Sequence, residues 1–212
     1  MPQPRSQAEF QVVFVCTGNR FRSPLAAELF RARTTGLPVS VRSAGTLELG
    51  PASVLAEALE HGSRLGIDLS SHQASCLVGE DLSGADLIIG FEHMHVATAV
   101  VEAHAKRERT FTLPELVGLL ENSSGGSAAA ESIEQAETAV AQADALRRSA
   151  GLPIGYPEIA DPLGARREVS MKTAEIIDTL TNRLVLGLFG VSPTGARAEP
   201  ETESRRGSSR GR

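Results

Sequence analysis

Apolar residues along this chain form short continuous runs, separated by longer segments in which apolar and polar residues recur at helical spacing. The clearest run, at residues 11–16, is rich in valine and phenylalanine and shows no polar alternation, which is typical of a strand covered on both faces. Similar runs predict three further strands, at residues 39–43, 87–89 and 110–113.

Segments with helical character lie between and after these strands. Ser23 and Pro24 predict a helix start, with the serine hydroxyl as N-cap and the proline in the first turn. The other predicted helices cover residues 54–65, 93–107, 131–150 and 167–189. Strands separated by helices of this length imply right-handed βαβ units. The sequence therefore predicts a three-layer α/β fold, an open parallel sheet with helices on both faces.

Apolar spacing predicts the buried face of three of these helices. In the 54–65 helix that face is formed by Leu55, Ala58, Leu59 and Leu65. In the 131–150 helix a narrow seam is formed by Ile133, Ala136, Val140, Ala143 and Leu146. In the last helix the apolar residues recur every four positions, at Ile176, Leu180, Leu184 and Leu188.

Composition divides the chain into one domain and three appended segments. Residues 10–190 are predicted to form the α/β domain, and residues 1–9 a flexible N-terminus. A linker rich in serine, glycine and alanine at residues 122–130 precedes the 131–150 helix, so residues 122–155 are interpreted as a helical insertion lying on the domain. Residues 191–212 are too polar to repay the entropy of ordering and are predicted to be a disordered tail.

Charge and cysteine content narrow the classes of function. The 212 residues include 26 acidic and 21 basic side chains, a net charge of -5, which argues against a nucleic-acid or anionic-membrane surface covering the protein. Two cysteines cannot hold a domain of this size together, and their scarcity fits a reducing compartment. No apolar stretch approaches the roughly 20 residues that a membrane span requires, nor is there a secretory signal. We therefore expect a cytoplasmic location.

The candidate chemistry lies directly after the first strand. A thiol, Cys16, stands at the carboxyl end of that strand, and Arg22 follows six positions later at the entrance to a helix. If the intervening loop curves, its backbone N–H groups converge on one point, Gly18 allowing unusual dihedral angles and Asn19 a left-handed one. The amides, the helix dipole and Arg22 would together bind an anion and stabilise the Cys16 thiolate. The sequence thus predicts a phosphate-binding loop with a cysteine nucleophile.

The segment from Val15 to Pro24 resembles the signature loop of the low-molecular-weight protein tyrosine phosphatases. The similarity continues at Ser43-Ala44-Gly45-Thr46, at His72, and at Asp161-Pro162 before the last helix. It implies a four-stranded parallel sheet and metal-free hydrolysis of phosphomonoesters in two steps through a cysteinyl phosphate.

The resemblance also implies a role for each site residue. Cys16 attacks phosphorus and Asp161 serves as general acid and then base, while Arg22 binds the phosphoryl oxygens together with the loop residues Thr17, Gly18, Asn19, Arg20, Phe21 and Ser23. Asn19, Ser43 and His72 match positions that hold the loop in shape, and Ser23 the position that stabilises the thiolate. The expected substrate is a phosphotyrosine protein or a small aryl phosphomonoester, and no cofactor is expected.

Two departures from the family pattern are informative. Many members have a second cysteine inside the loop where this chain has Phe21, so protective disulfide formation within the loop is impossible here. Whether Cys76 can replace it stays open. Leu163 stands where aromatic residues usually line the substrate slot, and Leu47 and Leu49 are candidates to complete an apolar wall.

Alternatives remain at this stage. Arsenate reduction on the same fold and a catalytically silent phosphate-binding module are both compatible with the loop. His93 and His95 lie two apart and point in different directions on a helix, so a shared metal ion is disfavoured and no metal is expected. The oligomeric state is not disclosed by the sequence.

Overall fold

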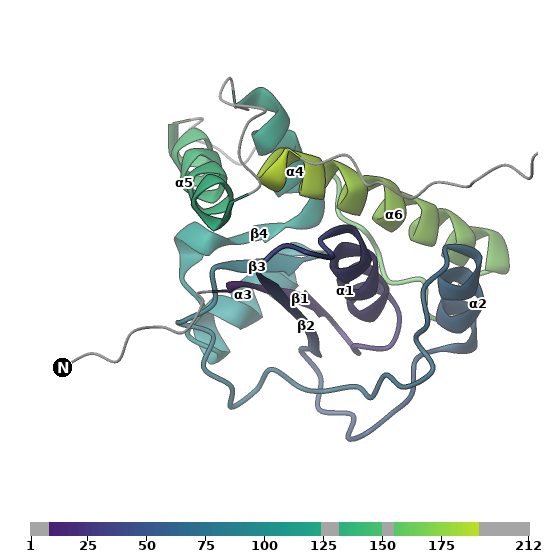
Figure 1. Cartoon of the computed structure of the whole chain (residues 1–212). Coiled ribbons are helices and arrows are strands. Elements are labelled where there is room, and N and C mark those ends of the chain that lie inside the picture. Colours follow the sequence, from purple (N-terminus) through teal and green to yellow (C-terminus); the bar gives the residue numbers. More distant parts are fainter. Residues whose placement is uncertain (1–8, 124–131, 150–154, 191–212) are drawn as a thin grey trace, which may run out of the picture.

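A computed structural model describes residues 9–123, 132–149 and 155–190 (Figure 1). Its four strands are β1 (Phe10–Cys16), β2 (Val39–Gly45), β3 (Leu87–Gly90) and β4 (Thr110–Thr112). All pair in parallel, in the order β2-β1-β3-β4. The predicted open, four-stranded parallel sheet is confirmed. Because the strands are parallel, the ends of β1, β2 and β3 and the loops that follow them meet at one edge of the sheet.

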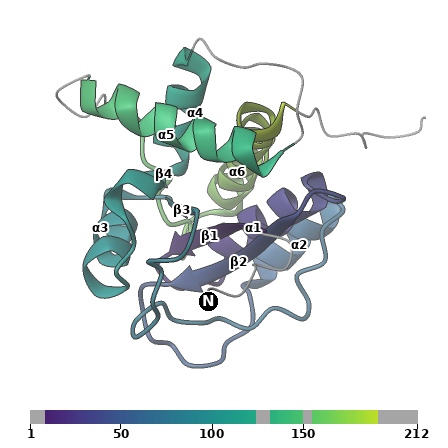
Figure 2. The ribbon, with the colours of Figure 1, turned by 60° about the vertical axis from the view of Figure 1, so that its left-hand side comes forward.

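The strands alternate between two apolar layers. Phe10, Val12, Phe14 and Cys16 belong to the cluster shared with α1 (Arg22–Arg33), α4 (Leu113–Asn122) and α6 (Arg167–Phe189). The intervening Val13 and Val15 belong to the smaller cluster on the other face, which includes Ala99 of α3 (His93–Glu102). Figure 2 shows α3 apart from α1, α2 (Ala56–Arg64) and α6, with the sheet between. The predicted three-layer arrangement is therefore confirmed.

One helix was not predicted. Helix α4 follows β4 without a loop: Thr112 is its N-cap, and the Thr112 hydroxyl accepts a hydrogen bond from the Glu115 amide while the Glu115 carboxylate accepts one from the Thr112 amide. This capping box, with Pro114 in the first turn, is a signal readable in the sequence. The helix buries six apolar residues on the α6 side of the sheet: Leu113, Pro114, Leu116, Val117, Leu119 and Leu120.

Several helix boundaries differ from the prediction, and those of α1 and α3 are the most informative. Helix α1 begins at Arg22 with Phe21 as N-cap, so the prediction that Ser23 caps the helix is wrong: its hydroxyl lies inside the first turn and contacts Cys16 instead. Helix α3 ends at Glu102 rather than at residue 107. There the chain turns through His104, whose φ is 55°, and the short 3-10 helix η1 (Arg107–Arg109) leads into β4.

Two predicted core positions lie outside the core. Leu59 in α2 and Ile176 in α6 are 39% and 38% exposed, and neither belongs to the core. In α6 the neighbouring Ile177 is fully buried instead. A helix has 3.6 residues per turn, so a four-residue spacing rotates by about 40° at each step and turns Ile176 away from the face that contains Leu188.

Helix α5 (Ile133–Ser149) lies against α4 and α6. Ala136, Val140 and Ala143 of its predicted seam are buried in the main core, and Arg147 places its guanidinium 4.1 Å from the centre of the Phe111 ring. The predicted N-terminus and tail, and most of the predicted linker, lie outside the described residues. Among the described residues, no helix is both long and apolar enough to span a bilayer.

Candidate active site

Cys16 lies at the edge of the sheet where β1 ends. Its side chain is almost fully buried, and its sulfur lies 3.0 Å from the Ser23 hydroxyl in the first turn of α1. The contact arises because the loop between β1 and α1 reverses the chain within five residues, 17–21. A hydroxyl at this distance can donate a hydrogen bond to a thiolate.

The backbone of the loop faces in two directions. The carbonyls of Cys16, Thr17 and Arg20 accept hydrogen bonds from the amides of Thr46, Leu47 and Leu55, respectively. The amides of residues 17–21, by contrast, donate to no acceptor within the described part of the chain. Five adjacent amides without a protein acceptor, next to a sulfur atom and a guanidinium, form a cradle suited to an oxyanion.

Asn19 holds this conformation. Its φ of 51° lies in the left-handed region, as the sequence predicts, whereas Gly18 has no positive φ. The Asn19 amide group donates to the hydroxyls of Ser23 at 2.9 Å and Ser43 at 2.8 Å, and its side-chain oxygen accepts from the Ser75 amide. A nitrogen of the His72 ring lies 2.9 Å from the Asn19 carbonyl oxygen. The structure thus brings Ser43 and His72 against the loop.

A glycine in β2 permits this close packing. A Cβ on Gly45 would lie 2.9 Å from the Thr17 carbonyl oxygen and 3.2 Å from Asn19. Real side chains do not approach a backbone oxygen so closely, so the loop could not rest against β2 with any other residue at this position.

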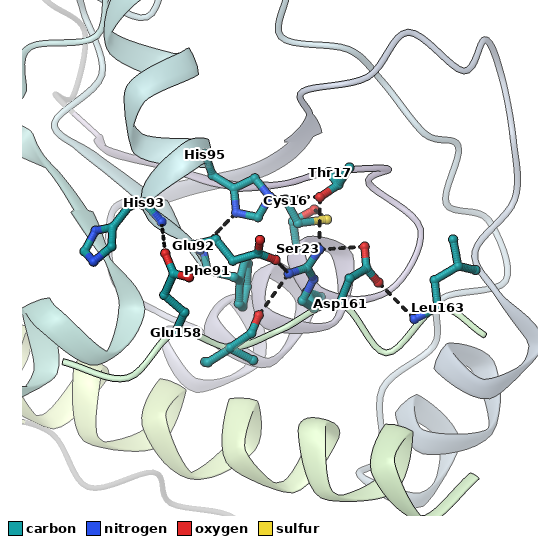
Figure 3. A network of polar contacts seen from close by, with 12 residues as sticks. Cys16, Thr17, Ser23, Phe91, Glu92, His93, His95, Glu158, Asp161 and Leu163 are labelled. Carbon is teal, nitrogen blue, oxygen red and sulfur yellow. Dashed lines mark hydrogen bonds and ion pairs between the residues drawn. The ribbon is translucent and has the colours of Figure 1, made fainter. Parts of the chain in front are cut away.

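Arg22 is buried at the back of the cradle, with 1% of its side chain exposed. Its Nη1 atom pairs with the carboxylate of Glu92 and donates to the Ile159 carbonyl oxygen at 2.9 Å. Its Nη2 atom contacts Asp161 Oδ2 at 2.6 Å and the Thr17 hydroxyl at 3.1 Å. Figure 3 shows Thr17, Glu92 and Asp161 around this guanidinium. Contacts at both terminal nitrogens, Nη1 and Nη2, therefore hold the guanidinium in one position.

His95 and Glu92 form part of the site and were missed from the sequence. Nδ1 of His95 accepts hydrogen bonds from the amides of Phe91 and Glu92, so the proton of the neutral ring is on Nε2, which lies 3.0 Å from the Thr17 hydroxyl (Figure 3). Burial, assisted by the charge of Arg22, lowers the pKa of His95 to about 4. His95 is therefore a neutral donor to Thr17 near pH 7. Glu92 and His95 follow shortly after the buried strand β3, and that position was the signal available in the sequence.

Asp161 reaches the site on a segment anchored by its backbone. The Ile159 amide donates to the Phe91 carbonyl oxygen at 2.9 Å, while the Ile159 carbonyl oxygen binds Arg22. Two residues later the second oxygen of Asp161 accepts from the Leu163 amide at 3.1 Å. The structure therefore brings Asp161 to the loop from 139 residues away in sequence.

A pocket of about 230 Å³ opens over the sulfur. Its wall contains the apolar residues Leu47, Leu49, Leu55, Leu163 and Phe21 together with Cys16, Thr17, Gly18, Arg20, Arg22 and Asp161. Leu47, Leu49 and Leu163 are 51%, 49% and 68% exposed and form its rim. The three leucines expected to form an apolar wall do line this pocket.

Cys76 lies too far away to protect Cys16 through a disulfide. Cys16 is the register partner of Gly45, and Gly45 in turn bridges to Cys76. Two strand spacings of about 4.8 Å separate the two cysteines by roughly 10 Å. A disulfide requires Cα atoms within about 7 Å.

The described residues offer no metal site. No three His, Cys, Asp or Glu side chains are grouped as a metal ion requires among them. His93 is exposed, whereas His95 is buried against Thr17, so the two histidines do not converge.

Comparison with known proteins places this arrangement among phosphatases. Residues 11–125 match the model of the family described as low molecular weight phosphotyrosine protein phosphatase. Over 108 residues, half of this chain and 71% of the relative, the sequence is 37% identical to a protein-arginine-phosphatase of Bacillus subtilis. Over 99 residues, 47% of this chain and 66% of the relative, it is 34% identical to the low molecular weight protein-tyrosine-phosphatase Etp of Escherichia coli.

Solved structures are similar over a larger share of the chain. A crystal structure of a low molecular weight protein tyrosine phosphatase from T. tengcongensis aligns with a TM-score of 0.61 at 29% identity, covering 84% of this chain and 98% of that one. A structure of a YwlE mutant from Bacillus subtilis aligns with a TM-score of 0.60 at 26% identity, covering 83% and 96%.

Proposed function

The chain belongs to the low molecular weight phosphotyrosine protein phosphatase family and is a cysteine-based phosphatase, and from this premise we propose that it hydrolyses phosphotyrosine or a related aryl phosphomonoester through a cysteinyl-phosphate intermediate. One observation carries the proposal: five loop amides, residues 17–21, donate to no acceptor in the described part of the chain and lie next to Cys16 and the buried guanidinium of Arg22. This combination favours a phosphate dianion in line with a thiolate.

In the first step the Cys16 sulfur attacks phosphorus. The S–P bond forms as the bond from phosphorus to the leaving oxygen breaks, and the loop amides with Arg22 hold the equatorial oxygens. Ser23, 3.0 Å from the sulfur, stabilises the thiolate before attack and as it is released. Thr17, His95 and Glu92 keep the loop and the guanidinium in position.

Asp161 is the proposed general acid and base. A bound phosphoryl dianion competes with Asp161 for Nη2 of Arg22, which frees this carboxyl to face the leaving oxygen. The acid then gives its proton to the leaving oxygen. In the second step the same carboxylate takes a proton from water as the water oxygen attacks phosphorus and the S–P bond breaks, which yields inorganic phosphate and restores both groups.

The substrate pocket favours an aryl group over an arginine side chain. Apolar leucines suit a phenyl ring, whereas Arg20, which also lines the pocket, would repel the positively charged guanidinium of phosphoarginine. Phosphoarginine hydrolysis is the second candidate because a relative at 37% identity is named a protein-arginine-phosphatase. Arsenate reduction and a catalytically silent module find no comparable support, since the named relatives are phosphatases.

Turnover of p-nitrophenyl phosphate and of phosphotyrosine and phosphoarginine peptides tests the proposal. We expect kcat/KM to be higher for phosphotyrosine than for phosphoarginine, and Cys16→Ser to lower turnover by at least about 1000-fold. Asp161→Asn should lower kcat by about 100-fold for phosphotyrosine and by much less for p-nitrophenyl phosphate, whose leaving group needs no proton. Equal losses with both leaving groups would refute the role of Asp161, and preference for phosphoarginine would refute the substrate.

A further inference from the structure

Arg20 is the cation of the pocket wall that no carboxylate neutralises. Among the described residues, no acidic side chain lies within ion-pair distance of its guanidinium, whereas Arg22, deeper in the pocket, pairs with both Glu92 and Asp161. The positive charge of Arg22 is therefore already balanced. An anion that approaches the pocket therefore meets the positive charge of Arg20, which forms no ion pair among the described residues.

The segment after β2 fixes Arg20 in place. Nε of Arg20 donates to the Ser53 carbonyl oxygen at 2.8 Å, and the Arg20 carbonyl oxygen accepts from the Leu55 amide at 2.8 Å. With Nε occupied, Nη1 and Nη2 donate to no acceptor in the described part of the chain and remain available to a ligand. A guanidinium held at one nitrogen and free at the other two is arranged for bidentate contact with a carboxylate or a phosphate.

Apart from Asp161, which pairs with Arg22, the described residues of the pocket wall supply no charge contact that competes with Arg20. Leu47, Leu49 and Leu163 are apolar and partly exposed, and Glu48 between the first two is exposed and forms no ion pair with Arg20. A substrate that occupies the cradle through its phosphoryl group therefore presents its neighbouring groups to leucines and to one cation.

We infer that Arg20 is a specificity-determining residue that selects phosphomonoesters carrying a second anionic group next to the phosphorylated one, such as a phosphotyrosine flanked by an acidic side chain. This inference rests on the proposed function and refines it. The phosphoryl group binds the loop amides and Arg22, and the second carboxylate or phosphate binds Nη1 and Nη2 of Arg20. Because the contact lies at a solvent-accessible rim, it weakens as salt screens it.

Matched phosphotyrosine peptides test the inference. One peptide carries aspartate and glutamate beside phosphotyrosine, and its partner carries asparagine and glutamine at the same positions. For the unaltered protein we expect kcat/KM to be about 3- to 10-fold higher for the acidic peptide at low salt, and the ratio to fall toward one in about 0.5 M salt. In Arg20→Gln the ratio should be close to one, while Arg20→Lys should keep part of it because the charge remains.

A ratio near one in the unaltered protein at low salt would overturn the inference, as would a ratio that Arg20→Gln leaves unchanged. Arg148→Gln provides the control: it removes the same charge from an exposed side chain of α5 and should keep the full ratio. If Arg148→Gln lost the ratio equally, net charge rather than Arg20 would be responsible. Turnover of p-nitrophenyl phosphate by the unaltered protein tests the proposed function separately. If this compound is hydrolysed but the two peptides react equally fast, only the inference about Arg20 fails. If this compound is not hydrolysed, the proposed function itself fails.

Discussion

The Ile159 carbonyl oxygen accepts a hydrogen bond from Nη1 of Arg22 at 2.9 Å, although 137 residues separate the two in sequence. The Ile159 amide donates to the carbonyl oxygen of Phe91, the residue that directly follows β3. One residue thus connects the arginine of the loop, the third strand and the segment that carries Asp161. Any change that moves this segment should therefore alter catalysis by displacing Asp161, even where the loop itself is intact.

Gly118 provides a test of that coupling. A Cβ at this position in α4 would lie 2.2 Å from Cε1 of Tyr156, which precedes Ile159 on the Asp161 segment. Gly118→Ala must therefore displace the ring, and we expect kcat for phosphotyrosine peptides to fall by about 10-fold or more, with a smaller loss for p-nitrophenyl phosphate. Steady-state kinetics with both substrates checks this. Gly84→Ala is the control, because a Cβ there meets no atom within 4 Å, and equal losses in both variants would contradict the explanation.

Removal of the Glu92 carboxylate should destabilise the protein. Arg22 is 1% exposed and its ion pair with Glu92 is mostly buried, so Glu92→Gln leaves a buried guanidinium with less compensating charge. We expect the free energy of unfolding in urea to fall by about 1–3 kcal/mol. Inorganic phosphate should recover part of that loss, because the anion binds the folded state beside Arg22.

The control for Glu92 is an exposed ion pair. Glu80 pairs with Arg42, whose side chain is 47% exposed, so Glu80→Gln should cost less than about 1 kcal/mol. Phosphate should stabilise Glu80→Gln no more than it stabilises the unaltered protein. Similar losses in the two variants would show that Glu92 makes no special contribution.

His95 should make stability depend on pH. Its pKa is about 4 in the folded protein because burial disfavours the charged ring, against 6.5 when unfolded. Between these values the unfolded state binds the extra proton, so the free energy of unfolding decreases as pH falls from about 6.5 to about 4, by up to about 3 kcal/mol. Protonation would also remove the acceptor that binds the Phe91 and Glu92 amides.

Urea unfolding at several pH values measures this contribution. His95→Asn keeps an acceptor near the position of Nδ1 and does not titrate, so its stability should decrease less than that of the unaltered protein between pH 6.5 and pH 4. His93→Asn, at an exposed neighbour, should retain the original pH dependence. Parallel curves for His95→Asn and the unaltered protein would rule out His95 as the source.

Oxidation of Cys16 should proceed without a partner thiol. The two cysteines are about two strand spacings apart, and the loop that follows Cys16, residues 17–21, contains no second thiol. We expect hydrogen peroxide to inactivate the unaltered protein and Cys76→Ser at the same rate, with added dithiothreitol restoring activity only at the sulfenic acid stage. Mass spectrometry of the non-reduced protein should reveal no Cys16–Cys76 disulfide, and detection of one would overturn the geometric argument.

Some of the site could be predicted from the sequence because its signals are local. The apolar run before Cys16, the spacing to Arg22 and the left-handed Asn19 all lie within 13 residues, 10–22, and the structure has each of them. The sequence prediction contains no helix at α4 although Thr112 and Glu115 signal one: it assigns residues 110–113 to a strand and the residues after them to no element. Ile176 was misplaced because a four-residue repeat does not match the 3.6-residue turn.

The amino-acid sequence by itself determined the four strands, their parallel arrangement and the position of the thiol. These features depend on residues that are close together in the sequence, because short apolar runs form the buried strands and the segments between them reverse the chain. Only the tertiary structure decided which groups surround Arg22. Glu92, Asp161 and the Ile159 carbonyl come from segments 70, 139 and 137 residues away, and the last of these is a backbone group, identical in every residue type. A buried charge needs hydrogen-bond or ion-pair partners, and the segments that supply them are those that the packed sheet brings close to it. The fold as a whole therefore determines which partners it has.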